Sequence, residues 1–106
     1  MDAVQSEAVL RAAIQRARAE GLAIVTGTLG GRTVGCCCPL GALILDQSIP
    51  SEGPGARLDH VQRLMGWTNH QLSAFLRGFD HSRVESGPYQ DLNQLGLSLR
   101  AELSPV

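Results

Sequence analysis

Three adjacent cysteines, Cys36, Cys37 and Cys38, are the most conspicuous chemical feature of this 106-residue sequence. They directly precede Pro39, and proline is favoured at the first position of a helix. A thiol just before a helix N-terminus ionises more readily, because the helix dipole and the free backbone N–H groups stabilise the thiolate. The three cysteines are therefore candidates for thiol reactivity.

The spacing of other residues does not complete a reactive site around these cysteines. A catalytic thiolate needs a base within hydrogen-bond reach, and the three histidines, His60, His70 and His81, lie far along the chain. Zinc ligands lie two to four residues apart, whereas adjacent residues of a strand point to opposite faces. Since free cysteine is often buried, we interpret the cysteines as space-filling side chains at a strand-to-helix corner. We predict no catalytic residue, metal or cofactor, and keep a thiol-dependent redox or metal-binding protein as an alternative.

A second candidate site lies in residues 61–78, where Gly66 separates two apolar segments and Thr68 with Gln71 is expected to form a capping box at the start of the second one. With the apolar residues Leu72 and Phe75, this pattern resembles the helix-turn-helix of phage-repressor-like DNA-binding domains. The resemblance implies that the second helix presents four side chains to the DNA major groove: Asn69, His70, Ser73 and Arg77.

Two features disfavour DNA binding. Gln62 stands where the motif usually has alanine, which lets its two helices cross closely. Nine basic and ten acidic side chains give a net charge of −1, so the chain lacks the basic excess that supports docking on nucleic acid. We therefore keep a helix-turn-helix DNA-binding regulator as an alternative function.

The composition also bears on the compartment. No apolar run approaches the roughly 18 residues of a membrane span, and the N-terminus lacks the basic and apolar segments of a signal peptide. Three adjacent cysteines cannot form the spaced disulfide framework of a small secreted domain. We expect a cytoplasmic protein without a membrane segment.

Residues 3–20 have the pattern of an amphipathic helix, because Leu10, Ala13, Ile14 and Ala17 share one face. A capping box is expected at its start, formed by Asp2 and Gln5, and Gly21 is expected to end it.

The next residues predict a β-hairpin. The segment 22–28 is followed by Gly30-Gly31, which suits a type I′ turn, and then by residues 32–34. This register places Thr28 opposite Thr33 and Val25 opposite Cys36. A short buried helix is expected from Pro39 to Leu45, with a loop at residues 46–56.

The second half is predicted to be helical. One helix ends at Gly66, a second ends at Gly78, and a third carries leucines at intervals of three or four residues. Gly96 in the third helix weakens it or lets another backbone approach closely. Three aromatic residues are expected in the core: Trp67, Phe75 and Phe79.

Residues 3–45 are similar to small bacterial and phage proteins of unassigned activity that carry a Cys-Cys-Leu-Gly type motif. Cys37, Cys38, Leu40 and Gly41 match that motif, with Pro39 as an insertion. The similarity implies a local topology in which the cysteines lie at a buried strand-to-helix corner.

The predicted fold is one α+β domain over residues 1–106, with four to five helices packed around a two-stranded β-hairpin. The open hairpin edges are expected to form an interaction surface, because an isolated two-stranded ribbon is marginal in water. We expect a non-enzymatic protein-interaction or adaptor protein, which binds a protein partner or forms a homo-oligomer.

Overall fold

The computed structural model describes residues 1–46 and 54–103 of the chain. These residues form five helices: α1 (Ala3–Ala19), α2 (Pro39–Asp46), α3 (Pro54–Met65), α4 (Asn69–His81) and α5 (Gln90–Leu103). The predicted loop at residues 46–56 lies largely outside the described residues, and its last part is wrong because α3 begins at Pro54. Proline favours this first helical position, where its missing N–H has no intrahelical partner to lose.

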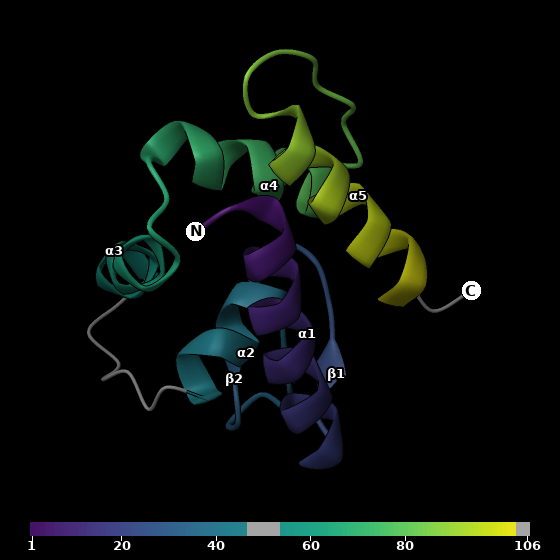
Figure 1. Ribbon diagram of the computed structural model, residues 1–106. Coiled ribbons are helices and arrows are strands. Elements are labelled where there is room, and N and C mark those ends of the chain that lie inside the picture. The colour runs from purple at the N-terminus through teal and green to yellow at the C-terminus, as the bar shows by residue number, and fades with distance from the viewer. Residues whose placement is uncertain (47–53, 104–106) are drawn as a thin grey trace.

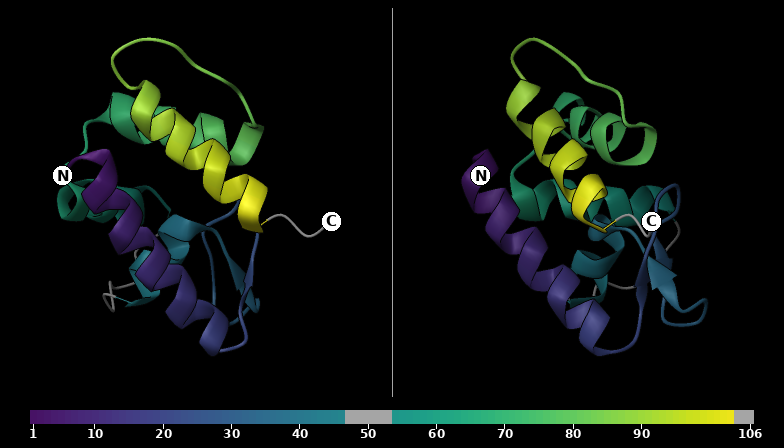
Figure 2. Two further views of the ribbon diagram at one scale, coloured as in Figure 1. Left: turned by 45° about the vertical axis from the view of Figure 1, so that its right-hand side comes forward. Right: turned by 90° about the vertical axis from the view of Figure 1, so that its right-hand side faces the viewer.

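The helices pack as two main pairs, α1 with α2 and α4 with α5. Figures 1 and 2 show α4 and α5 side by side at one end of the molecule, next to the N-terminal end of α1. The strands and the C-terminal end of α1 lie at the other end (Figure 2). The segment that carries the strands packs against α2, and the candidate site lies between them.

Local residues mark the helix ends as the sequence predicts. The amide of Gln5 donates to Asp2 Oδ1 at 2.8 Å and completes the capping box of α1. Thr68 and Gln71 form the same arrangement at the start of α4. Each box satisfies backbone N–H groups that have no partner within the helix.

The strands form a three-stranded mixed sheet rather than the predicted two-stranded hairpin. The strands β1 (Ala23–Ile24), β2 (Gly30–Gly31) and β3 (Cys36–Cys37) lie in the order β1-β3-β2. β3 is parallel to β1 and antiparallel to β2. The predicted α+β class is thus confirmed for the described residues, while the pairing of the strands is wrong.

The predicted turn at Gly30-Gly31 is also wrong, because both glycines lie within β2 and pair with Cys37 and Cys36. The chain turns instead at residues 32–35, where Gly35 has a φ of +74°. Neither predicted cross-strand pair forms: Thr28 and Thr33 lie outside the ladder, and Cys36 pairs with Ala23 and Gly31. Gly30 is needed for another reason: its φ is +67°, and a Cβ there would lie 2.0 Å from the Cys36 carbonyl oxygen.

Two glycines let α4 and α5 cross in backbone contact. A Cβ at Gly78 would lie 2.3 Å from the Asn93 carbonyl oxygen, and one at Gly96 would lie 2.3 Å from that of Phe75. The close approach predicted at Gly96 is confirmed. The predicted helix end at Gly78 is wrong, because α4 continues to His81 and is followed by Ser82 with a φ of +53°.

Polar side chains inside the core fasten separate segments together. Trp67, Phe75 and Phe79 are buried, as predicted, and Trp67 Nε1 donates to Ser6 Oγ at 3.2 Å. This hydrogen bond joins α1 to the residues that precede α4. The fully buried Asn93 donates to the Ala74 and Arg83 carbonyl oxygens. It therefore links α5 to α4 and to the segment between them.

The two adjacent glycines of β2 provide a test of this register. We expect Gly30→Ala to lower the free energy of unfolding by about 2 to 4 kcal/mol, because the new Cβ would meet the Cys36 carbonyl. Gly31→Ala should change it by less than about 1 kcal/mol, since a Cβ there has no atom within 4 Å. Urea denaturation of both variants measures the difference. Equal destabilisation would instead indicate the type I′ turn, in which both glycines need positive φ.

Candidate functional site

The three cysteines lie at the corner where β3 leads into α2. Cys36 is half-buried, whereas Cys37 and Cys38 are 0% and 3% exposed. Cys38 lies just before α2, where its carbonyl oxygen accepts from the Ala42 amide at 2.9 Å and its Sγ accepts from the Gly41 amide at 3.4 Å. The buried corner inferred from the sequence is thus present for Cys37 and Cys38.

Burial determines the protonation of the two inner thiols. It raises the pKa of Cys38 to about 11, although hydrogen bonds from the Gly41 and Leu40 amides act in the opposite direction. Burial also raises the pKa of Cys37, with a smaller contribution from Cys36. The helix N-terminus therefore favours the Cys38 thiolate as expected, but desolvation is the larger effect.

The histidines lie in separate places. His60 is half-buried in α3, His81 is exposed at the end of α4, and the His70 ring stacks on Tyr89 with centroids 6.1 Å apart. In residues 1–46 and 54–103, no group of three or more histidine, cysteine and acidic side chains could hold a metal ion.

Most of the four candidate DNA-reading residues interact with neighbouring side chains. Asn69 Oδ1 accepts from Gln62 Nε2 at 2.7 Å, and Arg77 pairs with Glu85. The His70 ring is stacked on Tyr89, and Ser73 is half-buried. These contacts constrain the side chains that would have to reach base edges.

The packing of the two helices also bears on the resemblance to a helix-turn-helix. α4 packs mainly on α5, and α3 packs on α2. Gln62, which takes the place of the usual alanine, bridges the turn to Asn69 through its side-chain amide. A DNA-binding role for Asn69, His70, Ser73 and Arg77 stays a prediction of the sequence.

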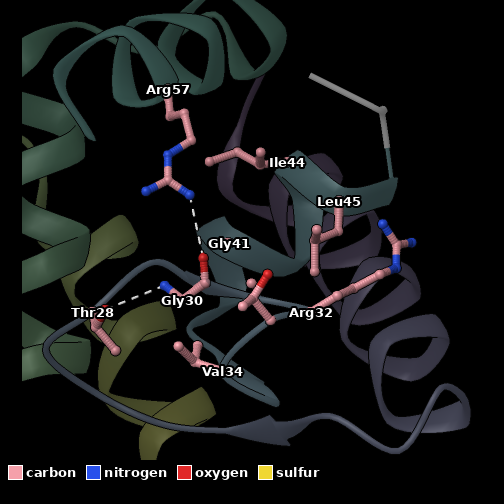
Figure 3. Close-up of a pocket in the computed structure, with 10 residues that line it drawn as sticks. Thr28, Gly30, Arg32, Val34, Gly41, Ile44, Leu45 and Arg57 are labelled. Carbon is pink, nitrogen blue, oxygen red and sulfur yellow. Dashed lines mark hydrogen bonds between the residues drawn. The ribbon is translucent and has the colours of Figure 1, made fainter. Parts of the chain in front are cut away.

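The larger of two neighbouring cavities, about 500 Å³, lies between α2, α3 and the hairpin that β2 and β3 form; we call it the hairpin groove. β2 and the turn after it form one wall, and α2 forms the other with Gly41, Ile44 and Leu45 (Figure 3). Val34 lies in the turn and is 65% exposed. The groove thus combines apolar walls with backbone and hydroxyl groups from the hairpin.

Two side chains of the groove, Thr28 and Arg57, cover the outer edge of β2 at Gly30. The Gly30 amide donates to Thr28 Oγ1 at 3.2 Å, and Arg57 Nη1 donates to the Gly30 carbonyl oxygen at 3.2 Å (Figure 3). Side chains of the same chain therefore take both outward-facing backbone groups of Gly30. An added strand would have to displace them.

Arg57 is the most distinctive polar residue of the hairpin groove. It is half-buried, and its Nε is buried without a hydrogen-bond partner among the described residues. A buried donor left unpaired costs about 1 to 3 kcal/mol, so this group is unusual in a folded protein. Four other arginines pair with carboxylates: Arg11 with Glu7 and Glu102, Arg16 with Asp46, Arg32 with Glu20, and Arg77 with Glu85.

Arg57 was not identified from the sequence, although a signal for it exists. Arg57, Val61 and Met65 are spaced four residues apart, so they share one face of α3. Val61 and Met65 are fully buried. An arginine that continues a buried apolar stripe indicates a polar site, because a buried charge needs a partner.

A second cavity of about 310 Å³ is also lined by Arg57, together with Leu58, Leu76, Cys38 and Asp80. Asp80 Oδ1 accepts from the Gly27 amide at 3.1 Å, which ties the end of α4 to the segment before β2. Arg57 and Thr28 line both cavities. The two cavities therefore differ in charge, since this one contains a carboxylate.

No protein-family model matches this chain, and comparisons with curated proteins and with solved structures find no match either. Of the helices that the structure describes, none has the length and apolar character needed to cross a membrane. The function of this chain is therefore inferred from its own geometry.

The burial of the thiols predicts the order in which they react. In the native protein at about pH 7.5, we expect iodoacetamide to modify Cys36 first and Cys37 and Cys38 at least roughly tenfold more slowly. Tandem mass spectrometry of the peptide that contains all three gives the rates. In denaturant the three rates should converge. Fast native modification of Cys37 or Cys38 would support the thiol-dependent alternative.

The raised pKa of Cys38 predicts a pH dependence of stability. Below pH 9.0 the thiol is protonated in both states, whereas between pH 9.0 and about 11 only the unfolded chain releases the proton. The free energy of unfolding should therefore fall by about 2 kcal/mol over this range from Cys38 alone. Cys38→Ala removes this contribution, so denaturation curves of the variant should fall less steeply with pH. Parallel pH profiles would contradict the assignment.

Proposed function

We propose that this chain is a small, non-enzymatic protein-interaction or adaptor protein whose partner binds in the hairpin groove. The observation that carries the proposal is the groove itself, which has apolar walls, an exposed valine at its rim and an arginine with unused donors. Clusters of this kind favour binding of another chain, because apolar area supplies affinity and a few polar groups fix orientation.

We propose the groove, rather than the strand edge beside it, as the interaction surface. At β2, Thr28 and Arg57 already satisfy the outward-facing groups of Gly30, so edge pairing gains little there. Val34 and the α2 residues Ile44 and Leu45 instead line a hollow that a partner side chain can enter. Such an apolar anchor in a pocket is the usual centre of a protein interface.

As part of this proposal, the protein works in the cytoplasm. All three cysteines are free thiols, and reducing compartments keep thiols in that form. A second copy of the chain is one form that the partner can take, because homo-oligomers are common among soluble proteins.

Site-specific photocrosslinking tests the proposed surface in the cells that produce the protein. We expect p-benzoylphenylalanine in place of Val34 to give a crosslinked protein partner, because Val34 lies at the groove. The matched control is the same replacement at Val84, which is 76% exposed and is not among the groove residues. Mass spectrometry identifies the product, and a product of twice the chain mass indicates a homo-oligomer.

The result that would overturn the proposal is equally specific. If Val34 gives no product beyond that of Val84, and light scattering shows a monomer at all concentrations, the groove is not a protein-interaction site. A product at Val84 alone would place the interface on the segment between α4 and α5 instead.

A further inference from the structure

Arg57 has one edge of its guanidinium group unused. Nη1 donates to the Gly30 carbonyl oxygen, and Nε is buried without a partner among the described residues. In that same part of the chain, no carboxylate forms an ion pair with Arg57. The unused edge is the one formed by Nε and Nη2.

This edge is the one that arginine uses to bind a carboxylate side-on, with two parallel hydrogen bonds. The same molecule provides an example at the groove wall. Arg32 Nε and Nη2 donate to the two carboxylate oxygens of Glu20 at 2.8 and 2.9 Å. Because Glu20 already occupies Arg32, Arg57 is the groove arginine with capacity for an external anion.

The residues that line the groove indicate which kind of anion can bind next to Arg57. None of the groove's described lining residues is acidic, whereas the smaller cavity that Arg57 also lines contains Asp80. Among the described lining residues of the groove, an anion beside Arg57 would therefore meet no competing carboxylate. Ile44, Leu45 and Val34 line the same space and offer apolar contact beside the charge.

We propose that Arg57 binds a carboxylate of the partner protein and that the α2 wall holds the apolar side chain next to it. This inference deepens the proposed function and rests on it. Nε is covered in the free chain, so full side-on pairing requires the Arg57 side chain to turn toward the groove. The 3.2 Å bond to Gly30 is the hydrogen bond of Arg57 that this movement stretches.

A titration of the full ¹⁵N-labelled chain tests the proposal with two matched probes. N-acetylleucine carries a carboxylate beside an apolar side chain, and N-acetylleucinamide has the same shape without the charge. We expect saturable shifts of the Gly30 and Gly31 amides and of the Arg57 Nε–H with N-acetylleucine. The amide probe should bind about tenfold more weakly or not at all.

Two variants of Arg57, one that removes its charge and one that keeps it, show whether Arg57 is responsible. Arg57→Gln should abolish the response to N-acetylleucine, and Arg57→Lys should weaken it several-fold, because an ammonium group cannot bind side-on. Arg63→Gln is the control, since it removes an exposed arginine from the same helix and leaves the groove unchanged. The dispersion of the amide spectrum reports whether each variant is folded.

Several outcomes would overturn the inference. These are equal binding of both probes, binding retained by Arg57→Gln, and tighter binding of inorganic phosphate than of N-acetylleucine. Crosslinking at Val34 without any carboxylate response would retain the proposed function and reject only this inference.

Discussion

The close approach of two backbones at Gly41 fixes the arrangement on which the groove depends. A Cβ at this position would lie 1.9 Å from the Leu29 carbonyl oxygen and 3.1 Å from Cys37 Cβ. This contact sets how near α2 lies to the segment that enters β2, and therefore how wide the groove is. The corner also needs small side chains, because Cys37 and Cys38 are buried there and packed interiors leave little free volume.

The helix starts, which depend on neighbouring residues, could be predicted from the sequence, whereas the strand pairing, which depends on distant contacts, could not. Both capping boxes and the start of α2 at Pro39 were correct because each is a local hydrogen-bonding arrangement. The Gly30-Gly31 signal was misleading because Gly30 serves a close approach to β3 instead of a turn. The parallel pairing of β1 with β3 gave no local signal at all.

The candidate site shows the same division. The burial of Cys37 and Cys38 followed from general properties of cysteine, and the competing effect of the helix N-terminus is present but smaller than desolvation. Arg57 could not be identified in this way, because what distinguishes it is the lack of a partner for its Nε among the described residues of the folded chain. Its position on the buried face of α3 can be found from the spacing of Val61 and Met65. Its missing partner can be seen only when the hairpin and α2 are placed around it.

The glycine contacts between α4 and α5 also have a mechanical consequence. Where backbones touch directly, as at Gly78 and Gly96, no flexible side chains can absorb a displacement. The direct contact therefore leaves little room for the two helices to shift against each other, and the buried Asn93 fastens the intervening segment to them. Asp80 at the end of α4 holds the Gly27 amide, next to the groove residue Thr28. One wall of the groove is thus held by the tightly packed α4–α5 pair, through a residue more than fifty positions away in sequence.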